Sequence, residues 1–142
     1  VAHDLIEHRK QAATKAVLAP LEQRLTTAFA ELTGDTARQV FLDERLQIAG
    51  IGRSREETHA FDQLSQGAKE QLLLCLRLAV AQELATEEPQ VLILDDVLVN
   101  TDLIRQDRVL DVLGTQAARM QILILTCHPD RYRGVGETIT LN

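Results

Sequence analysis

The chain has 142 residues, enough for one domain with a hydrophobic core. Its 45% hydrophobic and 25% charged residues are typical of an ordinary globular protein. An aromatic share of 3%, without Trp, argues against a base-stacking surface for single-stranded nucleic acid. A formal net charge of −6 argues against a nucleic-acid clamp formed by this chain alone. No apolar run reaches membrane-spanning length and no signal peptide is visible, so no membrane partner is expected.

Two cysteines, Cys75 and Cys127, lie far apart in the sequence, one in an apolar helical segment and one at the end of an apolar run. This arrangement indicates reduced, mostly buried thiols rather than a disulfide or zinc framework. It therefore predicts a cytoplasmic protein. The first residue is Val rather than Met, so we expect the sequence to be a piece of a longer protein.

Residues 4–32 are predicted to be helical, with a break or bend at Pro20. The first half of this segment has a weak, alanine-rich stripe, which suits either the end of a coiled coil or an amphipathic surface helix. Gly34 is predicted to end the helix, because glycine favours a left-handed cap. In the second half the apolar residues fall on one clear stripe: Leu21, Leu25, Ala28, Phe29 and Leu32.

Residues 39–53 alternate between apolar and polar side chains, with a plausible turn at Asp43-Glu44. This pattern predicts two short strands in an antiparallel hairpin. Residues 54–59 are charged and are predicted to form an exposed loop.

The rest of the chain is organised around the stretch from Phe61 to Leu84, which begins with a polar turn and continues as a helix. Ser65 can cap this helix or bind a phosphate oxygen, and Gly67 lets a ligand approach the backbone. The N-terminus of a helix also favours an anion. An ordinary Ser-capped core helix would have the same features. The apolar residues at helical spacing, which we expect to face the core, are Leu72, Leu73, Leu76, Val80 and Leu84.

Two continuous apolar runs, at residues 91–94 and 121–126, predict strands buried on both faces of a sheet. A helix from about Asp102 to Ala118 separates them, so the two strands are predicted to be parallel neighbours in a βαβ unit. The tail, residues 136–141, alternates in polarity and is predicted to be an edge strand. The helix residues expected to point inward are Ile104, Val109, Val112 and Leu113.

Polar residues follow both strands at their carboxyl ends, where open α/β sheets bind ligands. Asp95 and Asp96 follow the first strand, and His128 follows the second. One carboxylate there can hold Mg²⁺, the other can position or deprotonate an attacking water, and an imidazole can contact a γ-phosphate. An acidic turn and a surface histidine are the structural alternatives. A metal-dependent phosphohydrolase that uses these three residues is a remote functional alternative.

Taken together, these segments resemble the motifs of ABC-type ATPases. Leu64-Ser65-Gln66-Gly67-Ala68 resembles their signature motif, and residues 91–96 resemble their Walker B strand. Asn100-Thr101-Asp102 resembles their D-loop, and Leu125-Thr126-Cys127-His128 resembles their switch-histidine loop. The sequence is most similar to the C-terminal lobe of SMC-like and RecN-like heads, especially those of YhaN-type ATPases.

The resemblance implies an α/β fold, the C-terminal half of an ABC-type P-loop NTPase head. Residues 1–142 would form a single domain. Within it, residues 1–33 would be a helical coiled-coil end, and residues 34–60 a β-hairpin and loop. Residues 61–142 would hold the signature helix, the Walker B strand and the switch-histidine lobe.

The resemblance also implies roles for the strand-end residues. Asp95 would coordinate Mg²⁺ through water, and His128 would sense the γ-phosphate of ATP. Asp96 stands where these enzymes usually have a catalytic glutamate. Because Asp is one methylene shorter than Glu, a slow ATPase, or one that needs a partner, is possible.

The signature-like residues would act on the nucleotide of a second head. Ser65 and Gly67 would contact its γ-phosphate, and Asp102 would communicate across the dimer of heads. Gln66 departs from the Gly of many family members and would add a side chain near the phosphate.

No GxxxxGKS or GxxxxGKT sequence, the loop that cradles the β- and γ-phosphates, occurs in these 142 residues. The resemblance therefore implies that an N-terminal Walker A lobe of the same protein completes the head and that this chain alone is inactive. The implied function is ATP hydrolysis with Mg²⁺ at a site between two identical heads, in DNA repair or chromosome maintenance. DNA would bind the full-length protein. The main alternative is a clamp that ATP closes without hydrolysis.

Overall fold

The computed structural model describes residues 2–98 and 101–141. The chain contains both helices and strands, which alternate from α2 to β5, as the predicted α/β class requires. The elements are α1 (Ala2–Thr33), β1 (Gln39–Leu42), β2 (Ile48–Gly52), β3 (Thr58–Ala60), η1 (Phe61–Gln63), α2 (Gln66–Leu84), β4 (Val91–Asp95), α3 (Leu103–Gln116), β5 (Gln121–Leu125) and η2 (Pro129–Tyr132). No helix in these ranges is long and apolar enough to cross a membrane.

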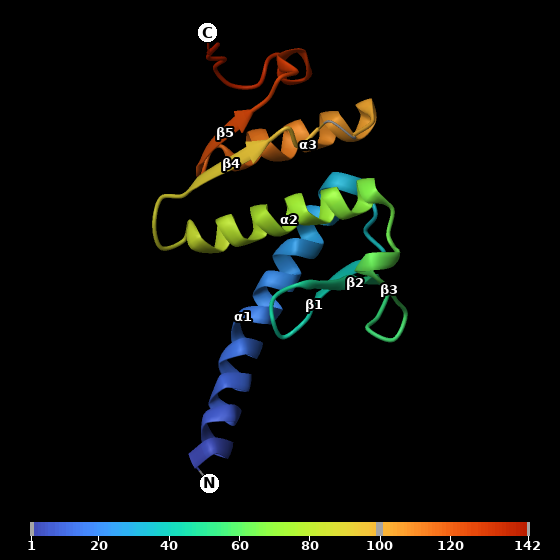
Figure 1. The fold of residues 1–142 in the computed structure, drawn as a ribbon, viewed down its shortest axis with the longest axis vertical. Helices are drawn as coiled ribbons and strands as arrows, with labels where there is room; N and C mark the ends of the chain where they lie inside the picture. Colours follow the sequence, from blue (N-terminus) through green and yellow to red (C-terminus); the bar gives the residue numbers. More distant parts are fainter. Residues whose placement is uncertain (1, 99–100, 142) are drawn as a thin grey trace.

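Helix α1 is longer than predicted and runs without interruption through Pro20, so of the two predicted alternatives, a break or a bend, the break is wrong. The apolar residues that follow Pro20, beginning with Leu21 and Leu25, are buried, and their packing holds the helix together despite the proline. The N-terminal part of α1 extends away from the other elements (Figure 1), and Leu5 and Ile6 are exposed there. Gly34 ends the helix with a φ of 75°, the left-handed cap expected from the sequence.

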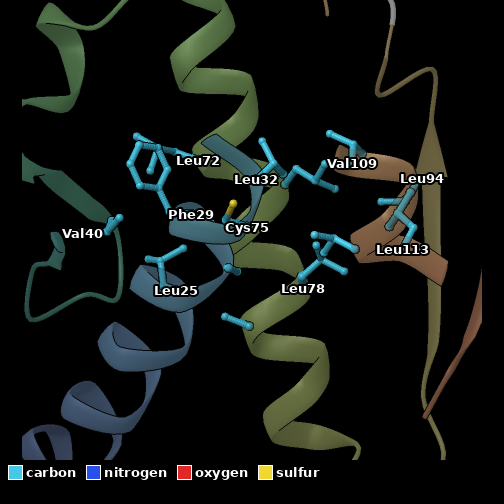
Figure 2. Packing of buried hydrophobic residues seen from close by; sticks show 14 of the residues in the cluster. Leu25, Phe29, Leu32, Val40, Leu72, Cys75, Leu78, Leu94, Val109 and Leu113 are labelled. Atoms are coloured by element: carbon cyan, nitrogen blue, oxygen red, sulfur yellow. The ribbon is translucent and has the colours of Figure 1, made fainter. Parts of the chain in front are cut away.

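The hydrophobic core lies between the C-terminal half of α1, helix α2 and helix α3 (Figure 2). The predicted stripe of α1 is confirmed, since all five of its residues are buried. Val40 of β1 joins the core from one side and Leu94 of β4 from the other. The core therefore packs the C-terminal half of α1 together with β4, the strand that leads to the acidic residues.

The predicted hairpin is confirmed, but it is part of a larger antiparallel sheet in the order β1-β2-β3. The segment predicted to be a loop supplies the third strand, so that prediction is wrong for Thr58 and His59. The reason lies in the glycines of β2. A Cβ atom on Gly52 would lie 2.0 Å from the Glu57 carbonyl oxygen, and one on Gly50 would lie 2.2 Å from the His59 carbonyl oxygen. Only glycine lets the two strands come this close.

Helix α2 begins and ends where the sequence predicts, but it buries a different face. Leu72 is buried, whereas Leu73, Val80 and Leu84 are exposed. Helix α2 is apolar over most of its surface, so periodicity alone does not identify the face that packs. Contacts with α1 determine that face, which carries Leu72, Leu74, Cys75, Leu78 and Ala79.

Strands β4 and β5 form a separate parallel pair, which confirms the βαβ unit. Leu94 is fully buried, but the neighbouring residues on the opposite side of the sheet are not. The prediction of burial on both faces is therefore wrong within this chain, because the described elements cover only one face. The exposed residues, here called the open sheet face, are Val91, Ile93, Leu123 and Leu125.

Helix α3 and the tail depart from the sequence prediction at their ends. Val109, Val112 and Leu113 are buried as predicted, but Ile104 is 72% exposed because it precedes the part of α3 that packs on the core. Residues 136–141 form no strand, since no described strand lies beside them to complete the hydrogen-bond ladder.

Candidate functional site

The carboxyl ends of β4 and β5 lie next to each other, because Asp95 pairs with Leu125 in the parallel register. The backbone N–H of Asp96 donates a hydrogen bond of 2.9 Å to the carbonyl oxygen of Leu125. Asp96 has a φ of 45°, a left-handed conformation that is uncommon for a residue other than glycine. Contacts with the loop after β5 hold it in this conformation.

The Asp96 carboxylate accepts a hydrogen bond at each oxygen. The Thr126 hydroxyl donates to Oδ1 at 2.6 Å, and the Cys127 thiol donates to Oδ2 at 3.3 Å. The same Thr126 hydroxyl accepts a hydrogen bond of 2.9 Å from the backbone N–H of His128. We call Asp96, Thr126, Cys127 and His128 the strand-end cluster.

The hydrogen bond from Thr126, with a smaller contribution from Cys127, lowers the pKa of the Asp96 carboxyl below its ordinary value. In return, the hydrogen bond to Asp96 raises the pKa of the Cys127 thiol. Cys127 is exposed, so the prediction of a buried thiol is wrong at this position: it lies beyond the end of the strand, in the loop. Cys75 is buried as predicted, and burial raises its pKa to about 12.

Asp95, the predicted metal ligand, ends β4 with its side chain exposed. Mg²⁺ usually keeps several waters and takes only one or two protein carboxylates, so an exposed carboxylate at a strand end suits it. Within residues 2–98 and 101–141, no group of three His, Cys, Asp or Glu side chains could hold a metal ion. A cation at Asp95 would need further ligands from a bound molecule, from water or from another segment.

The second candidate region is the first turn of α2. The Ser65 hydroxyl accepts a hydrogen bond of 3.3 Å from the backbone N–H of Ala68, which confirms the predicted cap. The Gln66 side chain donates to the Glu70 carboxylate at 3.0 Å and so lies along the helix, over its next turn. Apart from its chain neighbours and the nearby backbone of its own helix, a Cβ atom on Gly67 would meet no described atom within 4 Å. Neither packing nor backbone conformation within this chain explains the glycine, and the turn is open to a ligand.

Helix α2 and strand β4 run in opposite directions (Figure 1), so the N-terminus of α2 lies toward the end where β4 finishes. Asp102 caps α3 at this end, accepting a hydrogen bond of 3.0 Å from the backbone N–H of Arg105. No hydrogen bond or ion pair between described residues joins Ser65, Gln66 or Asp102 to the strand-end cluster. Asn100, in the predicted D-loop, lies outside the described residues. The structure thus gathers Asp96 and His128 but leaves the signature-like turn apart from them.

Two further side chains fix the strand-end loops, and no pattern in the sequence indicates either of them. The Arg131 guanidinium donates a short hydrogen bond to the carbonyl oxygen of Leu98, which joins the loop after β5 to the loop after β4. The Gln106 amide donates to the carbonyl oxygen of Arg131 at 3.0 Å. Both bonds link residues far apart in the sequence, so only the folded chain reveals them. Thr126, by contrast, already stood within the switch-histidine motif.

No protein-family model matches the chain. It is similar to an uncharacterized protein of Mycobacterium tuberculosis, with 40% identity over 100 residues, 68% of this chain and 11% of that protein. It is also similar to the DNA replication and repair protein RecF of Nostoc punctiforme, with 38% identity over 117 residues, 80% of this chain and 28% of RecF. The chain thus spans well under a third of the length of either relative.

Among solved structures, one from work on ATP-driven dimerization and DNA-stimulated activation of SMC ATPases has a TM-score of 0.64 at 15% identity. The match covers 83% of this chain and 73% of that one. The Smc head domain of Pyrococcus furiosus, bound to the C-terminal domain of ScpA, has a TM-score of 0.63 at 13% identity, covering 87% of this chain and 32% of that one. The predicted resemblance is therefore confirmed: this chain has the α/β fold of the C-terminal portion of an SMC-like ABC-type ATPase head.

Proposed function

We propose that the chain supplies the C-terminal portion of an ATPase head that binds and hydrolyses ATP between two heads. The observation that carries this proposal is the strand-end cluster, which gathers an acid and a histidine at the carboxyl ends of two parallel strands. Ligands of open α/β sheets bind at this place. The open first turn of α2 supports a second phosphate contact on the same chain.

Each residue would have one task in this site. Asp95 would hold Mg²⁺ through water, and the bound ion would neutralise charge that develops on the phosphates. Asp96 would orient and deprotonate the attacking water, and His128 would contact the γ-phosphate. Asp102 would contact the partner head.

The signature-like residues Ser65, Gln66 and Gly67 would bind the γ-phosphate of ATP held by the partner head. Backbone N–H groups of the first turn of α2 would donate to the phosphate oxygens. The open space beside Gly67, beyond the atoms of its own helical turn, supports this arrangement, because a phosphate could reach the backbone there.

We further propose that a Walker A lobe of the same protein completes the head. The open sheet face supports this: Val91 and Ile93 are 55% and 58% exposed, and Leu123 and Leu125 extend the apolar surface onto β5. Strands of a parallel sheet are normally covered on both faces. The 142 residues also lack a phosphate-binding loop of the Walker A type.

The second candidate function is an engagement clamp, in which ATP joins two heads with little or no hydrolysis. One observation favours it: both oxygens of Asp96 accept hydrogen bonds, and the lowered pKa makes this carboxylate a weaker base. No observation favours a metal-dependent phosphohydrolase, since the described residues hold no group of three possible metal ligands.

The biological role we propose is DNA repair or chromosome maintenance by the whole protein, acting in the cytoplasm. Similarity to RecF and the SMC-head fold support this role. The net charge of −6 favours DNA contact through other parts of the protein.

Mg²⁺-dependent ATP turnover by the full-length protein, with ATP binding measured in parallel, tests the proposal. Asp96→Asn should lower turnover by about a hundredfold or more while ATP binding persists, because general-base catalysis contributes that much. Asp111→Asn, the same change at an exposed position on α3, is the control and should leave turnover unchanged. An unchanged rate in Asp96→Asn would show that Asp96 is not catalytic. Negligible turnover by the wild type, together with ATP-dependent dimerisation, would instead support the clamp.

A further inference from the structure

We propose that Thr126 is a positioning residue: its hydroxyl sets the orientation of the Asp96 carboxylate and couples it to the loop that carries His128. This inference rests on the proposed function, because Asp96 and His128 are the residues to which that function assigns the chemistry.

The first argument is the bonding of the Thr126 hydroxyl. It donates to Asp96 Oδ1 at 2.6 Å and accepts from the backbone N–H of His128 at 2.9 Å. A hydroxyl has one hydrogen to donate and two lone pairs to accept with, so one side chain can make both bonds at once. Thr126 therefore bonds both the acid and the backbone of His128.

The second argument is the constraint on Asp96. Its backbone is fixed by the bond from its N–H to the Leu125 carbonyl oxygen, but that bond leaves the side chain free to rotate. Two groups restrain the carboxylate, the Thr126 hydroxyl and the Cys127 thiol at 3.3 Å. A thiol is a weak donor, and a short hydrogen bond to a charged group is a strong one. Thr126 therefore contributes most of the restraint.

The third argument concerns the loop after β5. The same hydroxyl that restrains Asp96 also accepts from the backbone N–H of His128, so a rotation of Thr126 would break both hydrogen bonds together. The loop is held at its other end by Arg131, whose guanidinium donates to the Leu98 carbonyl oxygen. His128 thus lies between two residues that fix the loop, Thr126 and Arg131, and of these Thr126 also bonds Asp96.

Thr126→Val in the full-length protein tests the positioning role, because valine keeps the shape of threonine and removes the hydroxyl. We expect kcat for ATP to fall about tenfold or more, the effect of losing a hydrogen bond to a charged group, with KM for ATP unchanged. Thr126→Ser keeps the hydroxyl and should restore kcat to within about twofold of the wild type. Thr115→Val is the matched control. Among the described residues its hydroxyl bonds only the Asp111 carbonyl oxygen of its own helix, so kcat should not change.

A second measurement needs neither ATP nor turnover. Amide hydrogen exchange at His128 should be faster in Thr126→Val than in the wild type and should return to the wild-type rate in Thr126→Ser, because the amide loses and regains its acceptor. Unchanged kcat and unchanged exchange in Thr126→Val would overturn the inference. Equal losses of kcat in the Val and Ser variants would also overturn it.

The two proposals fail in different ways. A wild-type protein that neither hydrolyses nor binds ATP contradicts the proposed function, whatever Thr126 does. Normal turnover by the wild type and by Thr126→Val contradicts only the positioning role.

Discussion

At the residue scale, Cys127 and Asp96 affect each other's pKa, because the thiol donates a hydrogen bond to the carboxylate. The hydrogen bond and the charge of Asp96 raise the pKa of the Cys127 thiol above its ordinary value of 9.0. The thiolate is the form that reacts with alkylating reagents, so Asp96 keeps an exposed cysteine in its unreactive form.

Asp96→Asn should therefore make Cys127 react faster with iodoacetamide at pH 8. The substitution removes the negative charge, the pKa of the thiol falls toward 9.0, and the thiolate fraction at this pH rises. Peptide mass spectrometry would follow the two cysteines separately. Cys75 is the internal control: it is buried, with a pKa of about 12, and should stay unmodified in both proteins. A slower or unchanged reaction of Cys127 would contradict the contact.

The identities of the candidate site residues could be predicted from the sequence, but their contacts could not. Asp96 and His128 each follow an apolar run, and this pattern is visible without a structure. The bond from Thr126 to Asp96 depends on the register of β4 against β5 and on the left-handed backbone of Asp96. Neither leaves a local signal in the sequence, because non-local packing determines both.

At the scale of elements, the first turn of α2 contains a glycine that the fold of this chain does not require. Gly67 and Gly114 both lie in helices, and at each position an added Cβ atom would meet no described atom within 4 Å beyond its chain neighbours and the nearby backbone of its own helix. Alanine is a better helix former than glycine, so neither position requires glycine for the fold.

Gly114→Ala should raise the free energy of unfolding by about 0.5–1 kcal/mol, and Gly67→Ala should raise it by a similar or smaller amount. Only Gly67→Ala should impair ATP turnover, because a methyl group there would lie between the backbone and the phosphate of the partner head. Urea denaturation and turnover of the two variants would check this. Equal turnover in both variants would argue that Gly67 does not contact nucleotide.

Elements with a strong local pattern were predicted well, and those defined by their neighbours were not. The extent of α2, the β1–β2 hairpin and the parallel β4–β5 pair were all visible in the sequence. Strand β3 was missed because it depends on a close approach to Gly50 and Gly52 of β2. The sequence does not identify the buried face of α2, because apolar residues surround most of this helix.

At the scale of the whole molecule, the proposed function explains two features that this chain alone does not, the open sheet face and the open signature-like turn. The open sheet face leaves apolar residues of β4 and β5 uncovered, and no hydrogen bond or ion pair between described residues joins the signature-like turn of α2 to the strand-end cluster. A Walker A lobe would cover the first, and the nucleotide of a second head would occupy the second. Both features are therefore expected of one part of a composite site.

The most direct test of the composite site is a mixing experiment with two variants of the full-length protein, Ser65→Arg and Asp96→Asn. In a symmetric pair of heads, each site would take Asp96 from one copy and Ser65 from the other. Each variant alone should be nearly inactive. In a mixed pair, however, one of the two sites receives both wild-type residues.

An equal mixture should recover about a quarter of the wild-type rate of Mg²⁺-dependent ATP turnover, because about half of the pairs are mixed and each mixed pair has one intact site. Recovered activity would establish that Ser65 and Asp96 act across the interface between two heads. No recovery, although the two variants form mixed pairs, would contradict the account and place both residues in the same copy's site or outside the site altogether.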